Sequence, residues 1–261
     1  MSSENVPVIE IHDLHKSFGS LEVLKGVDLR ADKGQVVSLI GSSGSGKSTL
    51  LRCANLLEDS QQGEIRFEGE SVSWHGSGLS RRPSDKAQVL RIRTNLSMVF
   101  QQFNLWSHLT ILQNVTEAPI TVLGLDRAEA EATGRDLLEK VGIGDKCDAY
   151  PAQLSGGQQQ RAAIARALAM SPKALLFDEP TSALDPELEQ EVVKVIKSLA
   201  EEGRTMIIVT HDMRMANDVS DHVVFLHQGK IEEEGPPDAM FGAPQTERLK
   251  QFLSATAPSD A

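Results

Sequence analysis

Eight residues near the N-terminus, Gly41 to Ser48, constrain this chain more than any other stretch. They read Gly-Ser-Ser-Gly-Ser-Gly-Lys-Ser and lie between the apolar run Val36 to Ile40 and the helix-prone run Thr49 to Leu57. A strand, a glycine-rich loop and a helix in this order can fold the backbone N–H groups of the loop into a nest for phosphate oxygens. The positive end of the helix points at the same place. The stretch therefore predicts a site for a nucleoside triphosphate, in preference to a flexible Gly/Ser linker.

Two side chains at the end of this loop have separate expected tasks. Lys47 can reach the β and γ phosphates, and the Ser48 hydroxyl can hold Mg²⁺. ATP and Mg²⁺ are therefore the expected cofactors. The other expected nucleotide-binding positions of the stretch are Gly41, Ser42, Ser43, Gly44, Ser45, Gly46 and Thr49.

The charge balance argues against broad nucleic-acid binding. The formal net charge is −11, whereas basic clusters supply most of the affinity for nucleic acids. One local basic cluster exists and is interpreted as a solvated face or loop; it contains Arg81, Arg82, Lys86, Arg91 and Arg93. No apolar run approaches the ~18 residues that a bilayer span needs. The first residues lack a secretory pattern, so the protein is expected to stay in the cytoplasm.

The two cysteines, Cys53 and Cys147, have no spacing suited to a metal. In a cytoplasmic protein they are expected to be reduced thiols. Cys53 falls inside the predicted helix after the loop, where packing is the favoured role.

Alternating strands and helices predict an α/β fold with a mainly parallel sheet, a small antiparallel β arm and an inserted helical subdomain. The ligand should lie at the carboxyl ends of the parallel strands. The expected strands are Val8–Ile11, Glu22–Leu29, Gly63–Glu68, Ser71–Trp74, Ser97–Phe100, Ala174–Asp178, Thr205–Thr210 and Val223–His227. The expected helices are Ile111–Leu123, Asp126–Val141, Gln158–Met170, Pro186–Glu201 and a short one from Met213, with a surface loop from Trp74 to Lys86.

The whole chain, 1–261, is expected to form a single ATPase domain with three parts. Residues 1–100 and 160–235 form the ATP-binding core with its β arm, and residues 101–159 form the helical subdomain. Residues 236–261 contain four of the eleven prolines and form a peripheral C-terminal tail with a frayed end.

A second motif, Ala174-Leu175-Leu176-Phe177-Asp178-Glu179, is a buried strand that ends in two carboxylates. Successive strand residues face opposite ways, so the two acids cannot do the same job. Asp178 is suited to hold Mg²⁺ through water. Glu179 is left free to act as general base toward the attacking water. The alternative is an ordinary solvated turn.

The third motif, Leu154-Ser155-Gly156-Gly157-Gln158, resembles the signature of the ATP-binding cassette family. Serine and glycine N–H groups at a helix start make an anion site. The alternative is an ordinary glycine-rich helix start. The resemblance implies a head-to-tail dimer, in which the signature residues Ser155, Gly156, Gly157 and Gln158 of one copy cover the nucleotide held by the other.

Four smaller matches follow the order of that family. Gln101 resembles the glutamine that touches Mg²⁺ and water, although Gln102 is adjacent. Ser182 to Asp185 resembles the loop that crosses the dimer interface, and Asp185 is also a candidate cap for the next helix. His211 resembles the histidine that contacts the γ phosphate and orients Glu179. Phe18 stands where the family stacks an aromatic ring on adenine, with core packing as the alternative.

Nearly the whole chain is similar to the ATP-binding subunits of bacterial polar amino-acid uptake systems, including that of the histidine permease. Met98-Val99-Phe100-Gln101 and Phe225-Leu226-His227-Gln228-Gly229-Lys230 carry this narrower resemblance. It implies an ATPase that energises import of a basic amino acid (histidine, arginine, lysine or ornithine) or an opine. Many relatives have Phe-Pro where this chain has Trp106-Ser107. Phe103 to Leu109 could line the groove for a permease helix, or could pack inside the helical subdomain.

The implied partners are a second copy of the chain, an integral membrane permease and, through it, an external solute-binding protein. No nucleic acid is expected. The protein would then lie peripherally on the cytoplasmic face of the cell membrane. The rival is a soluble, non-transport cassette that acts on ribosomes or DNA. Such proteins usually carry two cassettes or a long coiled coil, and this chain has one signature motif and an acidic balance.

Overall fold

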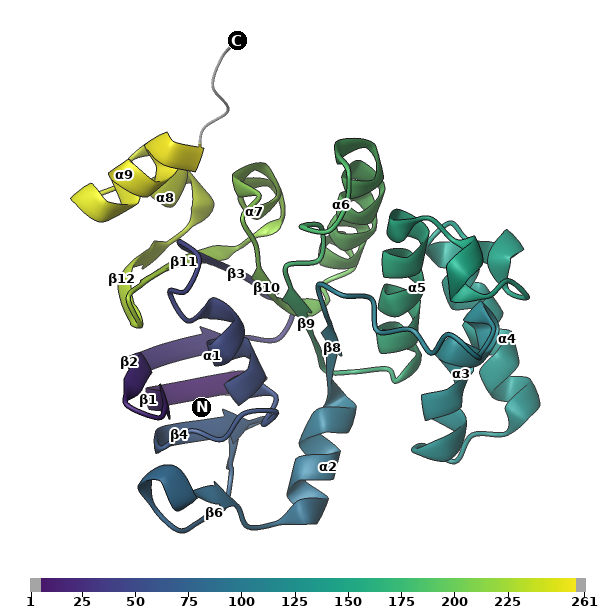
Figure 1. Ribbon diagram of the computed structural model, residues 1–261, viewed down its shortest axis with the longest axis horizontal. Coiled ribbons are helices and arrows are strands. Elements are labelled where there is room, and N and C mark those ends of the chain that lie inside the picture. The colour runs from purple at the N-terminus through teal and green to yellow at the C-terminus, as the bar shows by residue number, and fades with distance from the viewer. Residues whose placement is uncertain (1–5, 257–261) are drawn as a thin grey trace, which may run out of the picture.

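A computed structural model, which describes residues 6–256, contains two principal sheets (Figure 1). The antiparallel sheet has the order β2-β1-β4-β5. Its strands are β1 (Ile9–Phe18), β2 (Leu21–Ala31), β4 (Gln62–Phe67) and β5 (Glu70–Ser71). The six-stranded sheet has the order β12-β11-β3-β10-β9-β8. Its strands are β3 (Val36–Ile40), β8 (Leu96–Val99), β9 (Ala174–Asp178), β10 (Thr205–Val209), β11 (His222–His227) and β12 (Lys230–Gly235).

The six-stranded sheet is parallel except for β12, which pairs antiparallel with β11. Every residue of β3, β9 and β10 is buried. Continuous burial is expected of parallel strands that are covered on both faces. The predicted α/β fold with a mainly parallel sheet and an antiparallel arm is confirmed.

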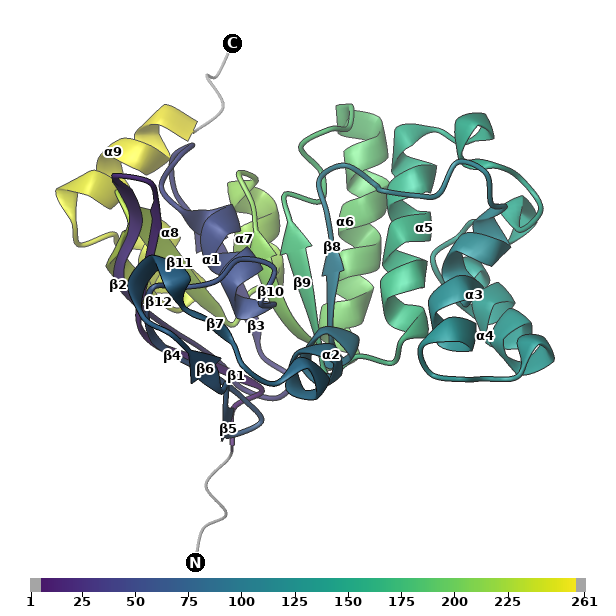
Figure 2. The same cartoon turned by 60° about the horizontal axis from the view of Figure 1, so that its bottom comes forward.

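Helix α1 (Lys47–Ala54) packs between the two sheets (Figures 1 and 2). Leu50 and Leu51 share one apolar cluster with Ile9 and Leu24 of the antiparallel sheet and Val209 of the parallel sheet. The opposite face of the parallel sheet is covered by α5 (Gly156–Ala169), α6 (Pro186–Glu201) and α7 (Met213–Val219). The loop before α1 is therefore fixed from both sides.

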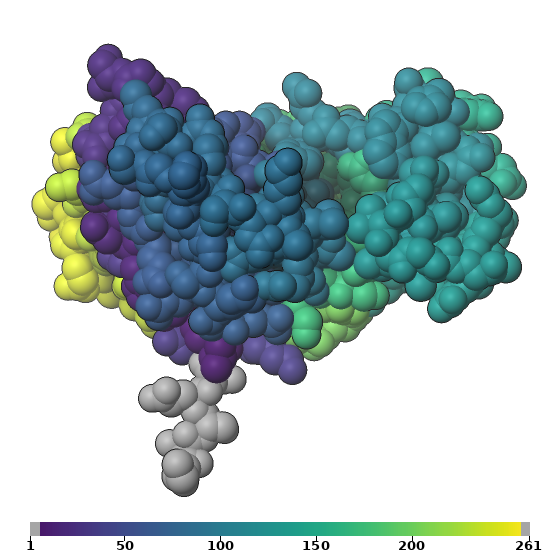
Figure 3. Space-filling model, turned by 90° about the horizontal axis from the view of Figure 1, so that it is seen from below, coloured from purple at the N-terminus to yellow at the C-terminus, as the bar shows by residue number. Residues whose placement is uncertain are grey.

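Helices α3 (Ile111–Thr121) and α4 (Arg127–Lys140) pack on each other and on α5. They form the teal end of the molecule, and from below a hollow separates this end from the blue α2 side (Figure 3). The predicted helices Ile111–Leu123 and Asp126–Val141 end within two residues of α3 and α4. The proposed boundary at residue 159 lies inside α5, and the division into parts stays a prediction.

The region after the arm differs from the expected loop. It contains β6 (Trp74–His75), η1 (Gly78–Ser80) and β7 (Arg82–Pro83), followed by α2 (Lys86–Asn95), which was not predicted. The carboxylate of Asp85 accepts hydrogen bonds from the backbone of Ala87 and Gln88 and starts this helix. The prediction of a short first strand is also wrong, because β1 continues past Ile11 through irregular pairing with β2 to Phe18.

The basic cluster makes several contacts within the chain, and two of its five side chains pair with carboxylates. Arg81 lies 4.1 Å from the Trp74 ring and donates to the Gly63 carbonyl. Arg82 and Arg91 pair with Asp59 and Glu70. These contacts favour the interpretation as a structural surface. The Trp74 ring thus packs against the guanidinium group of Arg81.

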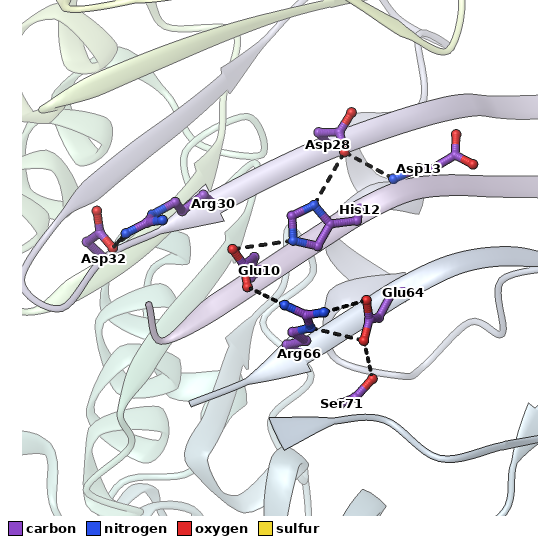
Figure 4. A network of polar contacts seen from close by, with 9 residues as sticks. All are labelled: Glu10, His12, Asp13, Asp28, Arg30, Asp32, Glu64, Arg66 and Ser71. Atoms are coloured by element: carbon purple, nitrogen blue, oxygen red, sulfur yellow. Dashed lines mark hydrogen bonds and ion pairs between the residues drawn. The ribbon is translucent and has the colours of Figure 1, made fainter. Parts of the chain in front are cut away.

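The solvent face of the antiparallel sheet carries a network of complementary charges (Figure 4). His12 lies 3.3 Å from Glu10 and 3.7 Å from Asp28, and Arg66 contacts both Glu10 and Glu64. Opposite charges on neighbouring strands stabilise a sheet modestly. In this network Arg66 offsets part of the repulsion between the acidic side chains on this face.

The C-terminal residues contribute more than a peripheral tail. Helices α8 (Pro237–Gly242) and α9 (Glu247–Thr256) bury Met240 and Leu249, and the Phe252 ring lies 5.2 Å from that of Phe225. The expected frayed end, 257–261, lies outside the described residues.

Both cysteines are buried and reduced, as predicted from the sequence. Cys53 belongs to α1 and is fully buried in the apolar cluster on which this helix packs. Burial raises the pKa of its thiol to about 12. The thiol is therefore uncharged and has a packing role.

Candidate nucleotide site

The phosphate loop, Gly41 to Ser48, joins β3 to α1 and is shaped by close neighbours. Gly41 has a φ of 146°, and a Cβ atom there would lie 2.1 Å from the Leu226 carbonyl oxygen. Gly46 has a φ of 109°, and its Cβ would lie 2.8 Å from Leu24 Cδ2. Only glycine tolerates both the backbone angle and this crowding. The two glycines therefore set the curvature of the loop before any ligand is considered.

Lys47, the first residue of α1, folds back over the loop. Its Nζ atom donates to the Gly41 and Ser42 carbonyls at 2.8 and 3.0 Å. Burial lowers the pKa of this ammonium group, and Glu179 and Asp178 oppose that effect. A desolvated ammonium group at the loop is well placed to bind phosphate oxygens.

Two buried polar atoms near this loop lack hydrogen-bond partners within the described residues: Ser45 Oγ and Asp178 Oδ1. Buried polar atoms are normally paired, so such exceptions point to a missing ligand. The second carboxylate oxygen, Asp178 Oδ2, lies 3.2 Å from Arg52 Nη2 of α1. The chemistry of these groups fits phosphate and a water-coordinated Mg²⁺. Arg52 was missed by the sequence analysis because 126 residues separate it from Asp178.

Glu179 and His211 meet beyond the ends of β9 and β10. Glu179 Oε1 and His211 Nε2 are 2.9 Å apart. Glu179 has an unusual φ of 51°, and its N–H group donates to the Val209 carbonyl. Strained backbone of this kind often occurs at functional sites. Both side chains line a cavity of about 310 Å³, together with Thr181, Ser182, Glu189, Thr210 and Asp212.

The signature loop, residues 154–158, begins α5. Ser155 Oγ accepts from the Gln158 N–H group, and Gln158 Oε1 accepts from the Ser155 N–H group. This reciprocal pair is a capping box. A Cβ atom on Gly156 would lie 3.0 Å from Leu184, and one on Gly157 would lie 3.0 Å from Leu188 Cβ. Strands β8 and β9 separate this helix start from α1 (Figures 1 and 2).

The sequence comparison supplies the family. A family model described as ABC transporter matches residues 24–182, more than half of the chain. The chain belongs to this family. The histidine transport ATP-binding protein HisP of Pseudomonas aeruginosa is 60% identical over 248 residues, which cover 94% of this chain and 97% of that protein. The octopine permease ATP-binding protein P of Rhizobium radiobacter is also 60% identical over 248 residues, which cover 95% of each.

A solved ABC cassette has the same fold. The dimeric post-hydrolysis structure of the ATP-binding cassette MJ0796 bound to ADP and Pi superimposes with a TM-score of 0.75. Its sequence is 33% identical, and the match covers 88% of this chain and 98% of that one. The family resemblance and the expected cassette fold are confirmed. Among the described residues of the ABC chain, no helix has the length and apolarity of a membrane span.

The remaining expected site residues of this ABC cassette lie near the surface. Gln101 and Gln102 are both exposed just after β8. Phe18 is 48% exposed at the end of β1, with Lys16 Nζ 4.6 Å from its ring. This exposure argues against the core-packing alternative. Asp185 is the N-cap residue of α6, as predicted, although its side chain makes no capping hydrogen bond.

The loop residues divide by exposure. Ser42, Ser43 and Gly44 are exposed, and Ser48 and Thr49 are half-buried. The buried residues are Gly41, Ser45, Gly46 and Lys47. Trp106 is 42% exposed, whereas Leu105 packs on the core formed with α3 and α5. Part of Phe103 to Leu109 therefore packs inside the helical subdomain, and its role in lining a groove for a permease helix stays a prediction.

Proposed function

We propose that this chain is the ATP-hydrolysing subunit of an importer for a basic amino acid (histidine, arginine, lysine or ornithine) or an opine. The observation that carries the proposal is the 60% identity, over nearly the full chain, to cassettes named for histidine transport and an octopine permease. The described site supports it, because the phosphate loop, two carboxylates and a histidine gather at one edge of the parallel sheet.

Two copies would bind head to tail on the cytoplasmic face of a membrane permease. An external solute-binding protein would deliver the solute to that permease. In this arrangement the partner's Ser155 and the partner's Gly157 cover the γ phosphate held by Lys47. The dimeric state of the related cassette with ADP and Pi supports this arrangement. It also explains why one chain carries two separate anion-binding surfaces.

Hydrolysis is an in-line attack of water on the γ phosphorus of ATP. The water oxygen forms a bond to phosphorus while the bond to the ADP oxygen breaks. Glu179 accepts a proton from the attacking water as general base. His211, 2.9 Å from that carboxylate, fixes its direction. Lys47 stabilises the charge on the transferring phosphoryl oxygens. ATP binding closes the dimer, and hydrolysis reopens it.

Adenine would stack on Phe18, and Asp185 would contact the dimer interface beside the nucleotide. Ser48, Gln101 and Asp178 would hold Mg²⁺. The unpaired Asp178 Oδ1 supports the assignment of Asp178. When bound, the ion neutralises charge on the β and γ phosphates.

The test of the chemistry is Glu179→Gln. General-base removal should lower hydrolysis by about 100-fold or more, while ATP affinity is retained and a dimer accumulates. Glu189→Gln is the matched control, because Glu189 lines the same cavity. Steady-state phosphate release, nucleotide binding and gel filtration with ATP measure these effects. Normal turnover by Glu179→Gln would remove Glu179 as the base.

The test of the transport role is ATP-dependent uptake by the complex reconstituted with its permease. Histidine, arginine, lysine, ornithine, glutamine and opines should be compared, with uptake expected for a basic amino acid or an opine. Cell fractionation separates the rival class. Membrane association that requires the permease supports import, whereas association with ribosomes or DNA would contradict it.

A further inference from the structure

Residues 101–110, here called the bridging segment, connect β8 to α3 without forming a helix or strand. The segment is nevertheless held by side chains from two helices. Asn114 of α3 is fully buried; its amide donates to the Trp106, Leu109 and Thr110 carbonyls and accepts from the Trp106 N–H group. The amide of Asn114 thus fixes the second half of the segment.

Arg166 of α5 fixes the first half. Its Nη1 donates to the Asn104 carbonyl at 2.6 Å, and its Nη2 donates to the Phe103 carbonyl at 3.0 Å. The guanidinium carbon lies 5.8 Å from the centre of the Trp106 ring. Asn104 has a positive φ of 51°, which turns the two carbonyls toward one donor group. The fork of the guanidinium matches this pair of acceptors.

The surroundings of Arg166 make the connection costly to break. Burial lowers the pKa of its guanidinium group. No carboxylate among the described residues forms an ion pair with Arg166. A partly buried charge that loses its hydrogen bonds has a desolvation cost. If α5 moved away from the bridging segment, the guanidinium group of Arg166 would therefore lose its two carbonyl acceptors.

Two further contacts join the same helix to this segment and to Phe100, the residue just before it. A Cβ on Gly156 would lie 3.5 Å from the Phe103 ring. Gln160, which is fully buried, donates to the Phe100 carbonyl at 3.4 Å. The start of α5, its second turn and its last turn thus all contact residues 100–106. Helix α5 and the bridging segment form one packed body.

We infer that Arg166, in the last turn of α5, is a positioning residue that ties this helix, which carries the signature loop at its start, to the exposed Trp106 surface. The inference rests on the proposed function, in which α5 approaches the partner's nucleotide. When α5 shifts on dimer closure, Arg166 carries residues 103–106 with it. ATP binding then moves Trp106, which lies on the surface available to the permease, although Trp106 does not contact ATP.

Tryptophan fluorescence can test this inference directly. The chain has two tryptophans, so Trp74→Phe leaves Trp106 as the only reporter. In the Trp74→Phe, Glu179→Gln background, ATP with Mg²⁺ should change the emission of Trp106. Adding Arg166→Met should abolish most of this change. ATP affinity and dimer formation should stay within about twofold.

The matched control is Arg161→Met on the same helix. Arg161 also donates to two successive carbonyls, those of Val141 and Gly142, and pairs with Glu191. This variant should lose stability similarly in thermal melts but keep the response of Trp106. Arg166→Lys, which keeps the charge but not the fork, should respond partly; it replaces Arg166→Met if that variant does not fold.

The outcomes separate the two proposals. An equal response of Trp106 with and without Arg166 would overturn the inference and leave the ATPase proposal intact. Loss of the response in Arg161→Met would also overturn it, because general loosening would then explain the effect. A background protein that binds ATP and dimerises without any change at Trp106 would contradict the inference alone. A background protein that binds no ATP would contradict the proposed function.

Discussion

The phosphate loop and the signature loop have similar composition but are built in different ways. In the phosphate loop, Gly41 and Gly46 adopt backbone angles that other residues avoid, and a buried ammonium group lies over the curve. In the signature loop, Gly156 and Gly157 have ordinary angles and leave room for leucines of the same chain. The first loop is shaped by strain and crowding around its backbone. The second is a capped helix start whose glycines serve packing.

This difference bears on where each surface can work. Lys47 and the unpaired atoms of Ser45 and Asp178 belong to the phosphate loop and its neighbours. Ser155 already uses its hydroxyl to cap α5. The phosphate loop can therefore bind a phosphate alone, whereas the signature loop offers little more than backbone N–H groups. That division suits a surface that completes a site held by another copy.

The strongest way to break the comparison is Gly41→Ala. The added methyl group would approach the Leu226 carbonyl at less than any normal contact distance. We expect a loss of about 4 kcal/mol or more in the free energy of unfolding, which is in the exceptional range for one substitution. Gly44→Ala is the control, since its Cβ meets nothing within 4 Å and adds only backbone strain. Urea denaturation measures both, and equal losses would contradict the crowding argument.

Lys47→Ala tests the buried cation. Loss of its charge-assisted bonds should weaken ATP binding by about 100-fold, since bonds to charged groups contribute about 1.5–3 kcal/mol each. Because burial lowers the pKa of Lys47, its charge is lost at a lower pH than in an ordinary lysine. ATP affinity should therefore fall as the pH rises through that lowered pKa. Calorimetric titration across alkaline pH measures this, and unchanged affinity in Lys47→Ala would count against the site.

Gly157→Ala tests the packing role of the signature glycines. Its new methyl group would press on Leu188 Cβ, which cannot move without α6. Overpacking of this kind costs about 1–3 kcal/mol, and the higher helix propensity of alanine recovers less than about 1 kcal/mol. Gly156→Ala would instead meet the mobile end of Leu184 and should be nearly neutral. Equal stabilities of the two variants would show that α6 does not constrain this loop.

Ser155→Ala should have the smallest effect. It removes the side-chain half of the capping box and should cost about 1 kcal/mol of stability. ATP binding by the single chain should not change, because its phosphate loop is complete without Ser155. Thermal melts and nucleotide titration check the two parts. A fall in the ATP affinity of the monomer would show that the signature loop also takes part in ATP binding by the single chain, which would contradict the distinction between the two loops.

The sequence predicted the strand, loop and helix around residues 41–48 better than the elements that surround them. The residues from Gly41 to Ser48 form a local pattern, so the strand, loop and helix could be predicted together. Helix α2 was missed because it buries only Gln88 and Ile92 and has no clear apolar stripe. The approach of Arg52 to Asp178 depends on the final packing of α1 against β9. Likewise, no local pattern shows that Leu188 fills the space beside Gly157.

The hairpin of β11 and β12 has a consequence for synthesis of the protein. Its turn supports the phosphate loop directly: the Gly229 N–H group donates to the Ser45 carbonyl, and the Leu226 carbonyl lies against Gly41. A ribosome makes this turn about 180 residues after the loop, roughly 10 to 40 s later at ordinary rates. Until then the phosphate loop lacks its contacts with Leu226 and Gly229. A nascent chain thus acquires its complete nucleotide site only after the β11–β12 hairpin has been made.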